Sequence, residues 1–445
     1  MLARGLTMLA LVLTTSALAS PARAGNDEGI LLGNEAAMTG GAVGAIIGDG
    51  TGVWYNPAGI ALVVRDQVDV SGSATMLRIG QAGAFFRTSS GAAASGDYFE
   101  LLAVPSAVSL VRPIDCRTNF ALGIFVPQLT DHTDRILLTE TFPDGSGGAR
   151  WQLSQHESTQ QYYAGLALGF AITETFRLGI TLFGFYRNYA NTSHFFGAQH
   201  DATDTTIATY GLAEFASVQA VGLELAGGLQ WEMVPGWLLG ITIRSPGLQL
   251  GTSSRVTSTG LVADPSGIFF EPEDSTGLVP NVQFVSPARI RASIAHRFAN
   301  GFVALEGDLA HPLDLPGDDL DRELLWNIRA GGRFWLDSRL ALGFGLFTDL
   351  SPLRSDPQAY GLTHIDYFGG SAGIEILNPH TLGEGESASD LVFSSTIGLR
   401  YAVGTGHIGG LRFDATAASD SRVTVTQVHT TVHELALHIG SALYF

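Results

Sequence analysis

The sequence contains no lysine, a single cysteine and few charged residues. With Cys116 alone, an intrachain disulfide is excluded. All 24 basic residues are arginines, so any acidic ligand group must be held by guanidinium forks. The formal net charge is −18, and this acidic balance argues against nucleic acid as a partner, because phosphate binding needs an excess of cations.

A long apolar run that could cross a membrane as a helix is also missing after residue 24. Even so, hydrophobic residues make up 45% of the chain, charged residues only 15%, and there are 55 glycines. Apolar content without a spanning helix is typical of alternating strands in a membrane. The composition therefore favours an all-β protein, a transmembrane antiparallel β-barrel. A soluble array of β-sandwiches is the alternative.

Residues 1–24 are predicted to be a signal peptide. Arg4 supplies the positive start, residues 6–18 form a short apolar core, and Ala22-Arg23-Ala24 fits the small-x-small cleavage rule. Cleavage is expected before Gly25, with a second acceptable site after Ala19. This core is too short to span a bilayer. Together with the composition of a transmembrane β-barrel, this cleaved signal predicts export to the bacterial outer membrane.

Residues 25–66 are rich in glycine and alanine and end in Trp54-Tyr55-Asn56-Pro57-Ala58-Gly59. Such a stretch is too poor in large side chains to form a core of its own, so we expect it to pack as a plug inside another structure. Pro57 fixes a turn, and Asn56 can hydrogen-bond backbone groups that lack partners. We predict that Asn56, Pro57 and Ala58 latch the plug in place.

Residues 67–445 are predicted to form the barrel, because alternating apolar rows dominate from Gln67 onward. Short connections alternate with long ones, as in barrels with periplasmic turns and external loops. The chain ends on Phe445, which resembles the assembly signal of outer-membrane barrels. About fourteen strands are expected, at residues 67–79, 102–114, 118–130, 157–172, 176–194, 216–233, 236–250, 282–298, 301–312, 323–336, 338–351, 362–377, 389–403 and 430–445.

If the apolar rows face lipid, a set of glycines faces the lumen near the short turns. Glycine weakens a strand unless another backbone approaches closely. These positions therefore predict where the plug lies, although glycine also permits barrel curvature. The set comprises Gly165, Gly169, Gly179, Gly228, Gly240, Gly331, Gly343, Gly345, Gly398 and Gly440.

The sequence combines the Asn56-Pro57-Ala58 motif, the Gly-rich stretch before it, about fourteen predicted strands, Ser286-Pro287, the run from Asp349 to Pro352 and an aromatic C-terminus. This combination resembles the FadL-type family of outer-membrane transporters. The resemblance covers nearly the whole mature chain. It implies passive uptake of long-chain fatty acids or aromatic hydrocarbons, without a cofactor or enzymatic activity. The partners that the resemblance implies are a hydrophobic small molecule, membrane lipid with lipopolysaccharide, and the barrel assembly machinery, which would act through Phe445.

In this family, ligand leaves sideways through a gap at a kinked third strand. Here that strand contains Gly123, which weakens it, and Pro127, which cannot donate to the sheet, so a wall gap is predicted at these residues. A proline at the end of a strand is the plain alternative. The predicted ligand-lining residues are luminal by register: Phe125, Phe183, Phe185, Arg187, Tyr189 and Arg244.

Two functions besides transport also fit the sequence. The barrel can act as a scaffold in protein secretion or assembly, with its lumen sealed by the plug. It can also act as a lipid hydrolase through Ser371, which lies in a Gly-x-Ser-x-Gly pattern but on a predicted strand instead of the required strand–turn–helix elbow. His433 and His438 point to opposite faces of a strand, which disfavours zinc. An acidic loop, Asp318 to Glu323, reads as solvated, with a divalent ion as the alternative.

Overall fold

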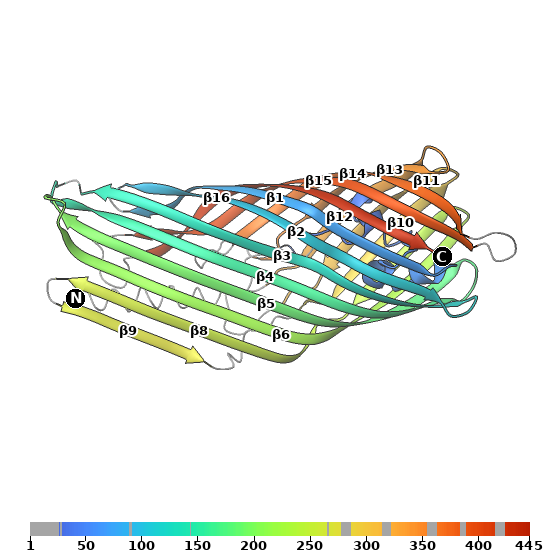
Figure 1. Ribbon diagram of the computed structural model, residues 1–445, viewed down its shortest axis with the longest axis horizontal. Coiled ribbons are helices and arrows are strands. Elements are labelled where there is room, and N and C mark those ends of the chain that lie inside the picture. Colours follow the sequence, from blue (N-terminus) through green and yellow to red (C-terminus); the bar gives the residue numbers. More distant parts are fainter. Residues whose placement is uncertain are drawn as a thin grey trace.

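The protein is a closed β-barrel in a computed structural model (Figure 1). The structure describes residues 26, 29–88, 91–142, 144–264, 267–276, 286–313, 322–353, 363–382, 389–413 and 423–445. The predicted signal peptide, residues 1–24, lies outside this set. Within it, no helix is long and apolar enough to cross a membrane.

In the described residues, sixteen strands form one sheet. They are β1 Gln67–Thr88, β2 Ala93–Pro113, β3 Thr118–Thr141, β4 Gly147–Ala171, β5 Phe176–Asp201, β6 Thr206–Val234, β7 Trp237–Arg244, β8 Leu248–Asp264, β9 Gly267–Thr276, β10 Arg289–Phe298, β11 Gly301–Ala310, β12 Leu325–Trp335, β13 Leu340–Asp349, β14 Thr363–Leu382, β15 Ser389–Phe413 and β16 Val423–Tyr444.

The pairing of β1 with β16 and of β5 with β6 closes the sheet into a ring. The predicted strand at 236–250 is divided, because Ser245, Pro246 and Gly247 interrupt it. β7 pairs with the lower part of β6, and β8 pairs with the upper part of the same strand. β8 then forms a hairpin with β9, outside the closed order. The predicted closed wall is therefore confirmed, except that the predicted strand at 236–250 is two strands, β7 and β8.

The strands of one side of the barrel are far longer than the sequence pattern indicates. β6 has 29 residues and β5 has 26, whereas β10, β11 and β13 have 10 each. The stretches 80–101, 131–156, 195–215 and 251–281, predicted as loops, are mostly strand in their described parts. In Figure 1 this long side extends past the shorter strands at the end opposite the C-terminus.

The physical reason is a change in which face is apolar. Near the short turns, Leu166 and Leu168 of β4 point outward and are 50% and 36% exposed. Farther out on the same strand, Trp151 and Leu153 point inward and are buried with Phe195 of β5. Polar side chains cover the outer face of this part of the strand. A prediction that expects apolar residues to face lipid therefore assigns it to a loop.

The tip of β1 crosses the outer mouth of the ring. Ala84 adopts a positive φ of 54°, and beyond it Phe86 to Thr88 pair in parallel with Leu411 to Phe413 of β15, which is not a neighbour of β1 in the wall. Phe85 and Phe86 are both buried there. This mouth strap (residues 84–88) brings an apolar cluster over the lumen, with Phe86 and Phe195 at a centroid distance of 6.4 Å.

Residues 29–66, here called the inner segment, fill the lumen near the short turns. They contain α2 Asn34–Thr39, α3 Gly52–Tyr55 and the 3-10 helix η1 Pro57–Leu62. In Figure 1 these short helices lie inside the ring, at the end that carries the C-terminus. The inner segment then joins β1, and the backbone N–H of Phe445 donates to the carbonyl of Asp66 at 3.0 Å.

The predicted inward glycines surround the inner segment. A Cβ at Gly179 would lie 2.2 Å from the Pro57 carbonyl carbon, and one at Gly345 would lie 2.1 Å from that of Thr39. A Cβ at Gly440 would lie 1.7 Å from Asn34 Oδ1. Gly398 is the looser case, with Ala37 O at 3.7 Å. Glycine at the tight positions is therefore required by the approach of a second chain segment.

Candidate functional site

The wall of the ring is open between the outer parts of β2 and β3. These strands pair only from Ala107 and Phe125 down to Pro113 and Asn119. Above that level β2 continues back to Ala93, paired with β1, and β3 continues to Thr141, paired with β4. Neither pairs with the other in this outer part, so two strand edges border an opening in the sheet.

Sequence explains why the pairing stops there. The β3–β4 register shifts between Phe125 and Gln128, which places Val126 and Pro127 in a bulge. Proline has no N–H to give to the ladder, and a bulge turns a strand away from its neighbour. Gly123 lies just below, still paired with Ser109. The two residues predicted for the wall gap thus flank the point where β3 leaves β2.

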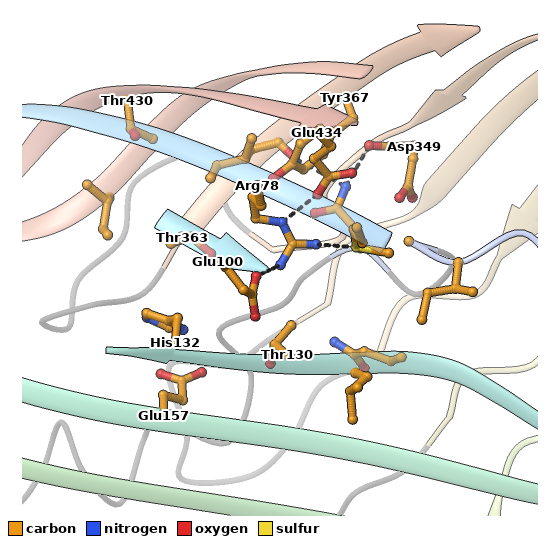
Figure 2. A pocket seen from close by; sticks show the side chains of 18 of the residues that line it. Arg78, Glu100, Thr130, His132, Glu157, Asp349, Thr363, Tyr367, Thr430 and Glu434 are labelled. Carbon is orange, nitrogen blue, oxygen red and sulfur yellow. Dashed lines mark hydrogen bonds and ion pairs between the residues drawn. The ribbon is translucent and has the colours of Figure 1, made fainter. Parts of the chain in front are cut away.

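A cavity of about 110 Å³ lies in the lumen directly behind this opening. β3 contributes Pro127 to Thr130, β2 contributes Glu100, and β1 contributes Met76 and Arg78. Apolar groups come from across the lumen, including Ile365 and Tyr367 of β14. Figure 2 shows the labelled side chains, with Arg78 between the two carboxylates of Glu100 and Glu434.

Arg78 is held on both sides. Its Nη1 donates to Glu100 Oε2 and its Nε to Glu434 Oε1, each at 2.7 Å (Figure 2). Glu434 also accepts from Arg400 Nη1 at 2.9 Å. The other oxygen of Glu100 accepts the backbone N–H of Asp131 on β3 at 2.6 Å. A side chain of β2 therefore bridges the opening where the backbones do not, through charge-assisted hydrogen bonds.

The six predicted ligand-lining residues lie elsewhere, and three of them contact Trp54 of the inner segment. Trp54 packs against Phe125, Tyr163 and Phe183 at centroid distances of 5.6, 5.1 and 5.7 Å. Arg244 lies over the Trp54 ring at 4.0 Å, donates to its carbonyl at 3.1 Å and pairs with Glu224 at 3.1 Å. Arg244, Phe125 and Phe183 therefore pack against the inner segment.

The remaining three are also buried. The guanidinium of Arg187 donates to the Tyr163 hydroxyl at 2.6 Å and to the Ser286 hydroxyl, and lies 4.9 Å from the centre of the Phe185 ring. Tyr189 is 1% exposed. None of the six is among the residues that line the cavity behind the opening. Their contact with a ligand stays a prediction.

The predicted latch lies at the junction of inner segment and wall. Asn56 is fully buried, and its Nδ2 donates to Gly44 O at 2.8 Å and to Leu229 O of β6 at 2.9 Å. Its Oδ1 accepts the Ala58 N–H at 3.1 Å, which caps the helix that Pro57 begins. One side chain thus connects two turns of the inner segment to a wall strand.

The alternative motifs have structural roles. Ser371 lies within β14, where its hydroxyl donates to Met38 O at 3.2 Å and accepts the Gly40 N–H at 2.8 Å. His438 lies beside Asn34 at 3.2 Å inside the ring, whereas His433 contacts the Tyr401 hydroxyl on the exposed side. In the acidic loop, residues 318–321 are outside the described residues.

The sequence pattern did not predict the groups around the cavity. Glu100 fell in a stretch predicted as an external loop, and the pairing of Arg78 with Glu434 joins residues from the first and last strands. One signal was present: Arg78 and Glu434 occupy luminal positions of otherwise apolar alternating strands, where a charge needs a partner.

No family model matches the chain, and no curated protein matches it. Solved structures do match. A FadL homologue of Pseudomonas aeruginosa has a TM-score of 0.61 at 11% identity, with 94% of this chain and 99% of that chain covered. The toluene transporter TodX of P. putida has a TM-score of 0.56 at 14% identity, and the toluene transporter TbuX of Ralstonia pickettii 0.53 at 13%, both with the same coverage.

Identities this low compare folds, and here the comparison extends over nearly all of both chains. The predicted resemblance is confirmed at that level: the chain has the fold of the FadL-type outer-membrane barrels.

Proposed function

We propose that the protein is an outer-membrane channel for the passive entry of hydrophobic small molecules, which leave sideways through the opening between β2 and β3. The observation that carries this proposal is the position of the cavity, which is lined by Glu100 of β2 and by Pro127 to Thr130 of β3 where these strands part. A molecule in the cavity is therefore next to the route into the membrane.

A straight path through the ring is blocked. The inner segment packs against the wall on several sides, through Asn119 of β3, Thr181 of β5 and Gln230 of β6 among others. Asn56 anchors it to β6 in the same region. We assign residues 25–66 the role of a plug and Asn56, Pro57 and Ala58 the role of its latch.

A sideways exit suits an apolar cargo. Each buried methylene is worth about 0.8 kcal/mol against water, so a route from an apolar cavity directly into lipid avoids a large rehydration cost. Ile30, Met76 and Leu129 give the cavity part of its apolar surface. On the lipid side, Phe99 and Leu101 of β2 are 64% and 60% exposed beside the opening. Apolar groups therefore continue from the cavity to the outer surface.

The two solved structures named as toluene transporters share this fold. They agree with an aromatic hydrocarbon as cargo, and the fold also suits a fatty acid of the kind the family resemblance implies. Phe445, at the end of the last strand, is proposed to guide assembly in the membrane.

The test is the initial rate of uptake of labelled toluene by cells with and without the protein, and with the cavity filled. Thr130 is buried and lines the cavity, so Thr130→Trp places an indole in the proposed path. Thr133→Trp is the matched control, because Thr133 is exposed on the other face of the same strand. We expect uptake to fall to the background rate in Thr130→Trp and to stay normal in Thr133→Trp.

The amount of folded barrel in the outer membrane is measured for every strain. Equal uptake with and without the wild-type protein would reject transport of this cargo and favour the scaffold role. Normal uptake in a folded Thr130→Trp protein would reject the cavity as part of the route.

A further inference from the structure

The mouth strap is joined to the wall by a turn in β1 that has the properties of a hinge. The register between β1 and β2 shifts after Ala82, so that residues 83, 84 and 85 stand opposite residue 95 alone before pairing resumes at Phe86. Ala84 has a φ of 54°, which L residues seldom adopt and which costs conformational energy. A Cβ at Gly83 would meet nothing within 4 Å. The turn is therefore strained, and there is free space beside it.

Beyond this turn, the strap is held to β15 by a short parallel ladder. Its rungs are Phe86 with Leu411, Arg87 with Arg412, and Thr88 with Phe413. Parallel pairing is slightly less stable per residue than antiparallel pairing. Three such rungs give the strap a weaker attachment than the long antiparallel ladders give the wall strands.

The middle rung also places like charges side by side. Arg87 and Arg412 are paired positions, and both side chains are exposed. Arg87 Nε donates to the carbonyl of Ala84 at 3.2 Å, which is within the strap itself. Among the described residues, no carboxylate forms an ion pair with either arginine. Like charges at paired positions destabilise two strands, so this rung favours separation of the strap from β15.

The strap lies directly above the cavity. Ile408 of β15 lines the cavity and also packs against the mouth cluster, the buried apolar cluster that contains Phe86. Val428 of β16, paired with Ile408, is a member of the same cluster. One luminal position farther out on β15, a Cβ at Gly410 would lie 2.5 Å from the Phe85 carbonyl oxygen. Glycine at this position therefore leaves the space through which the strap crosses.

Aromatic side chains extend the cover from the strap to the long strands of the wall. Phe86 contacts Phe195 of β5 at a centroid distance of 6.4 Å, and Phe195 stacks on Trp151 of β4 at 5.7 Å. These three side chains are 3%, 5% and 7% exposed, and Leu411, the partner of Phe86, is 2% exposed. With the strap paired, the mouth cluster therefore separates the cavity from the outer surface on this side.

We propose that the mouth strap is a gate through which hydrophobic cargo enters the cavity, and that it opens by releasing β15 and turning about Ala84. This rests on the proposed function and adds an entrance to the same site. Opening relieves the strain at Ala84 and separates Arg87 from Arg412, but it exposes the apolar side chains of Phe86 and Leu411. An apolar cargo offsets that cost by covering them, which a polar solute cannot do.

A disulfide across the ladder tests the gate. Arg87→Cys and Arg412→Cys together place two cysteines at paired positions of adjacent strands, about 4.8 Å apart, where a disulfide can form. Both are made in a Cys116→Ser background, because Cys116 is exposed. When the pair is oxidised, we expect the initial rate of toluene uptake to fall to that of cells without the protein, and to recover in dithiothreitol. Each single-cysteine variant is the control and should not respond to oxidant.

Charge reversal tests why the strap opens. Arg87→Glu and Arg412→Glu each turn the like pair into an opposite pair, and the double variant restores a like pair of the other sign. Cross-strand charge pairs are strong enough for this reversal to change opening by about two- to thirtyfold. Amide exchange of residues 84–88 in the purified barrel should slow by that factor in each single variant and return toward the wild-type rate in the double variant. Arg135→Glu, at an exposed position of β3, is the control.

The outcomes separate the gate from the proposed function. Protein-dependent uptake that is equal in the oxidised and reduced double-cysteine variant, with the disulfide confirmed, would overturn the gate and leave transport through the cavity intact. Exchange that is unchanged in both single reversals would overturn the like-charge basis of opening. If the double-cysteine variant does not assemble, normal uptake in reversals whose strap exchange has slowed would overturn the gate. Equal toluene uptake with and without the wild-type protein would reject the proposed function, and the gate with it.

Discussion

Replacing Asn56 with alanine should loosen the inner segment without unfolding the wall. The Asn56 side chain makes three hydrogen bonds, to Gly44 O, to Leu229 O and from Ala58 N–H. A hydrogen bond of this kind contributes roughly 0.5–1.5 kcal/mol net, so removing all three costs about 2–4 kcal/mol. Gly44 O keeps a second donor, Gln230 Nε2 at 3.3 Å, which favours the lower half of this range.

Hydrogen exchange measures this loss directly. Local opening free energies of a protein range from near zero to the global value, and each 1.4 kcal/mol is about tenfold in exchange rate. A loss of about 2–3 kcal/mol therefore predicts amide exchange roughly 30- to 150-fold faster in the peptide that spans Gly44 to Val63. Peptides from β4 and β5 should exchange as in the wild type, because Asn56 contacts neither strand through these bonds.

The matched control is Asn188→Ala, which removes the same side chain from the outer face of β5, where it is half-buried. Exchange in Asn56→Ala that equals the wild-type and control values would refute the anchoring role. Equally faster exchange of β4 and β5 would refute it in another way, since the change would then be global unfolding.

Two further predictions concern the wall. A Cβ at Gly345 would lie 2.1 Å from the carbonyl carbon of Thr39, so we expect Gly345→Val to displace the inner segment and to let large polar antibiotics enter cells. Gly307→Val is the control, because a Cβ there would have nothing within 4 Å, and these cells should stay resistant. Unchanged resistance with a folded Gly345→Val barrel would contradict the close packing. Glu100→Gln weakens the charge-assisted link from Arg78 through Glu100 to the Asp131 N–H, so the initial rate of toluene uptake should rise severalfold. A slower rate in an equally folded barrel would show that this link supports the open route instead of restraining it.

The ring and its lumen were predictable because membrane burial imposes a simple rule. Leu178, Ile180 and Leu182 face outward as their alternation indicated, and the glycines on the other face surround the inner segment. A glycine row in a strand has few explanations other than close approach or curvature. Sequence pattern alone was therefore sufficient for the part of the wall near the short turns.

The outer extension was not predictable by the same rule. Trp151, Leu153 and Phe195 are buried inside it, so the apolar face there is the reverse of the face near the short turns. If apolar residues are required to face lipid, each predicted strand ends where this reversal begins. Pro246 accounts for the division of the 236–250 strand, because proline has no N–H for the ladder.

The cavity was the least predictable part. Aromatic residues and arginines at luminal positions looked like ligand contacts, yet Phe125, Phe183 and Arg244 bind Trp54 of the inner segment. Alternation shows that a side chain faces the lumen, but not whether another segment already fills that part of it. Only the three-dimensional arrangement separates the filled part from the space beside Glu100 and Pro127.

The mouth strap sets an order for the folding of the chain. Phe86 to Thr88 and Leu411 to Phe413 come from opposite ends of the sequence, and β1 also needs β16 as a wall neighbour. Contacts between distant parts of a chain form late, because a large loop must be closed before they are gained. The tip of the first strand thus gains its partner on β15 only once nearly the whole chain is available, so we expect the mouth to be covered late in folding.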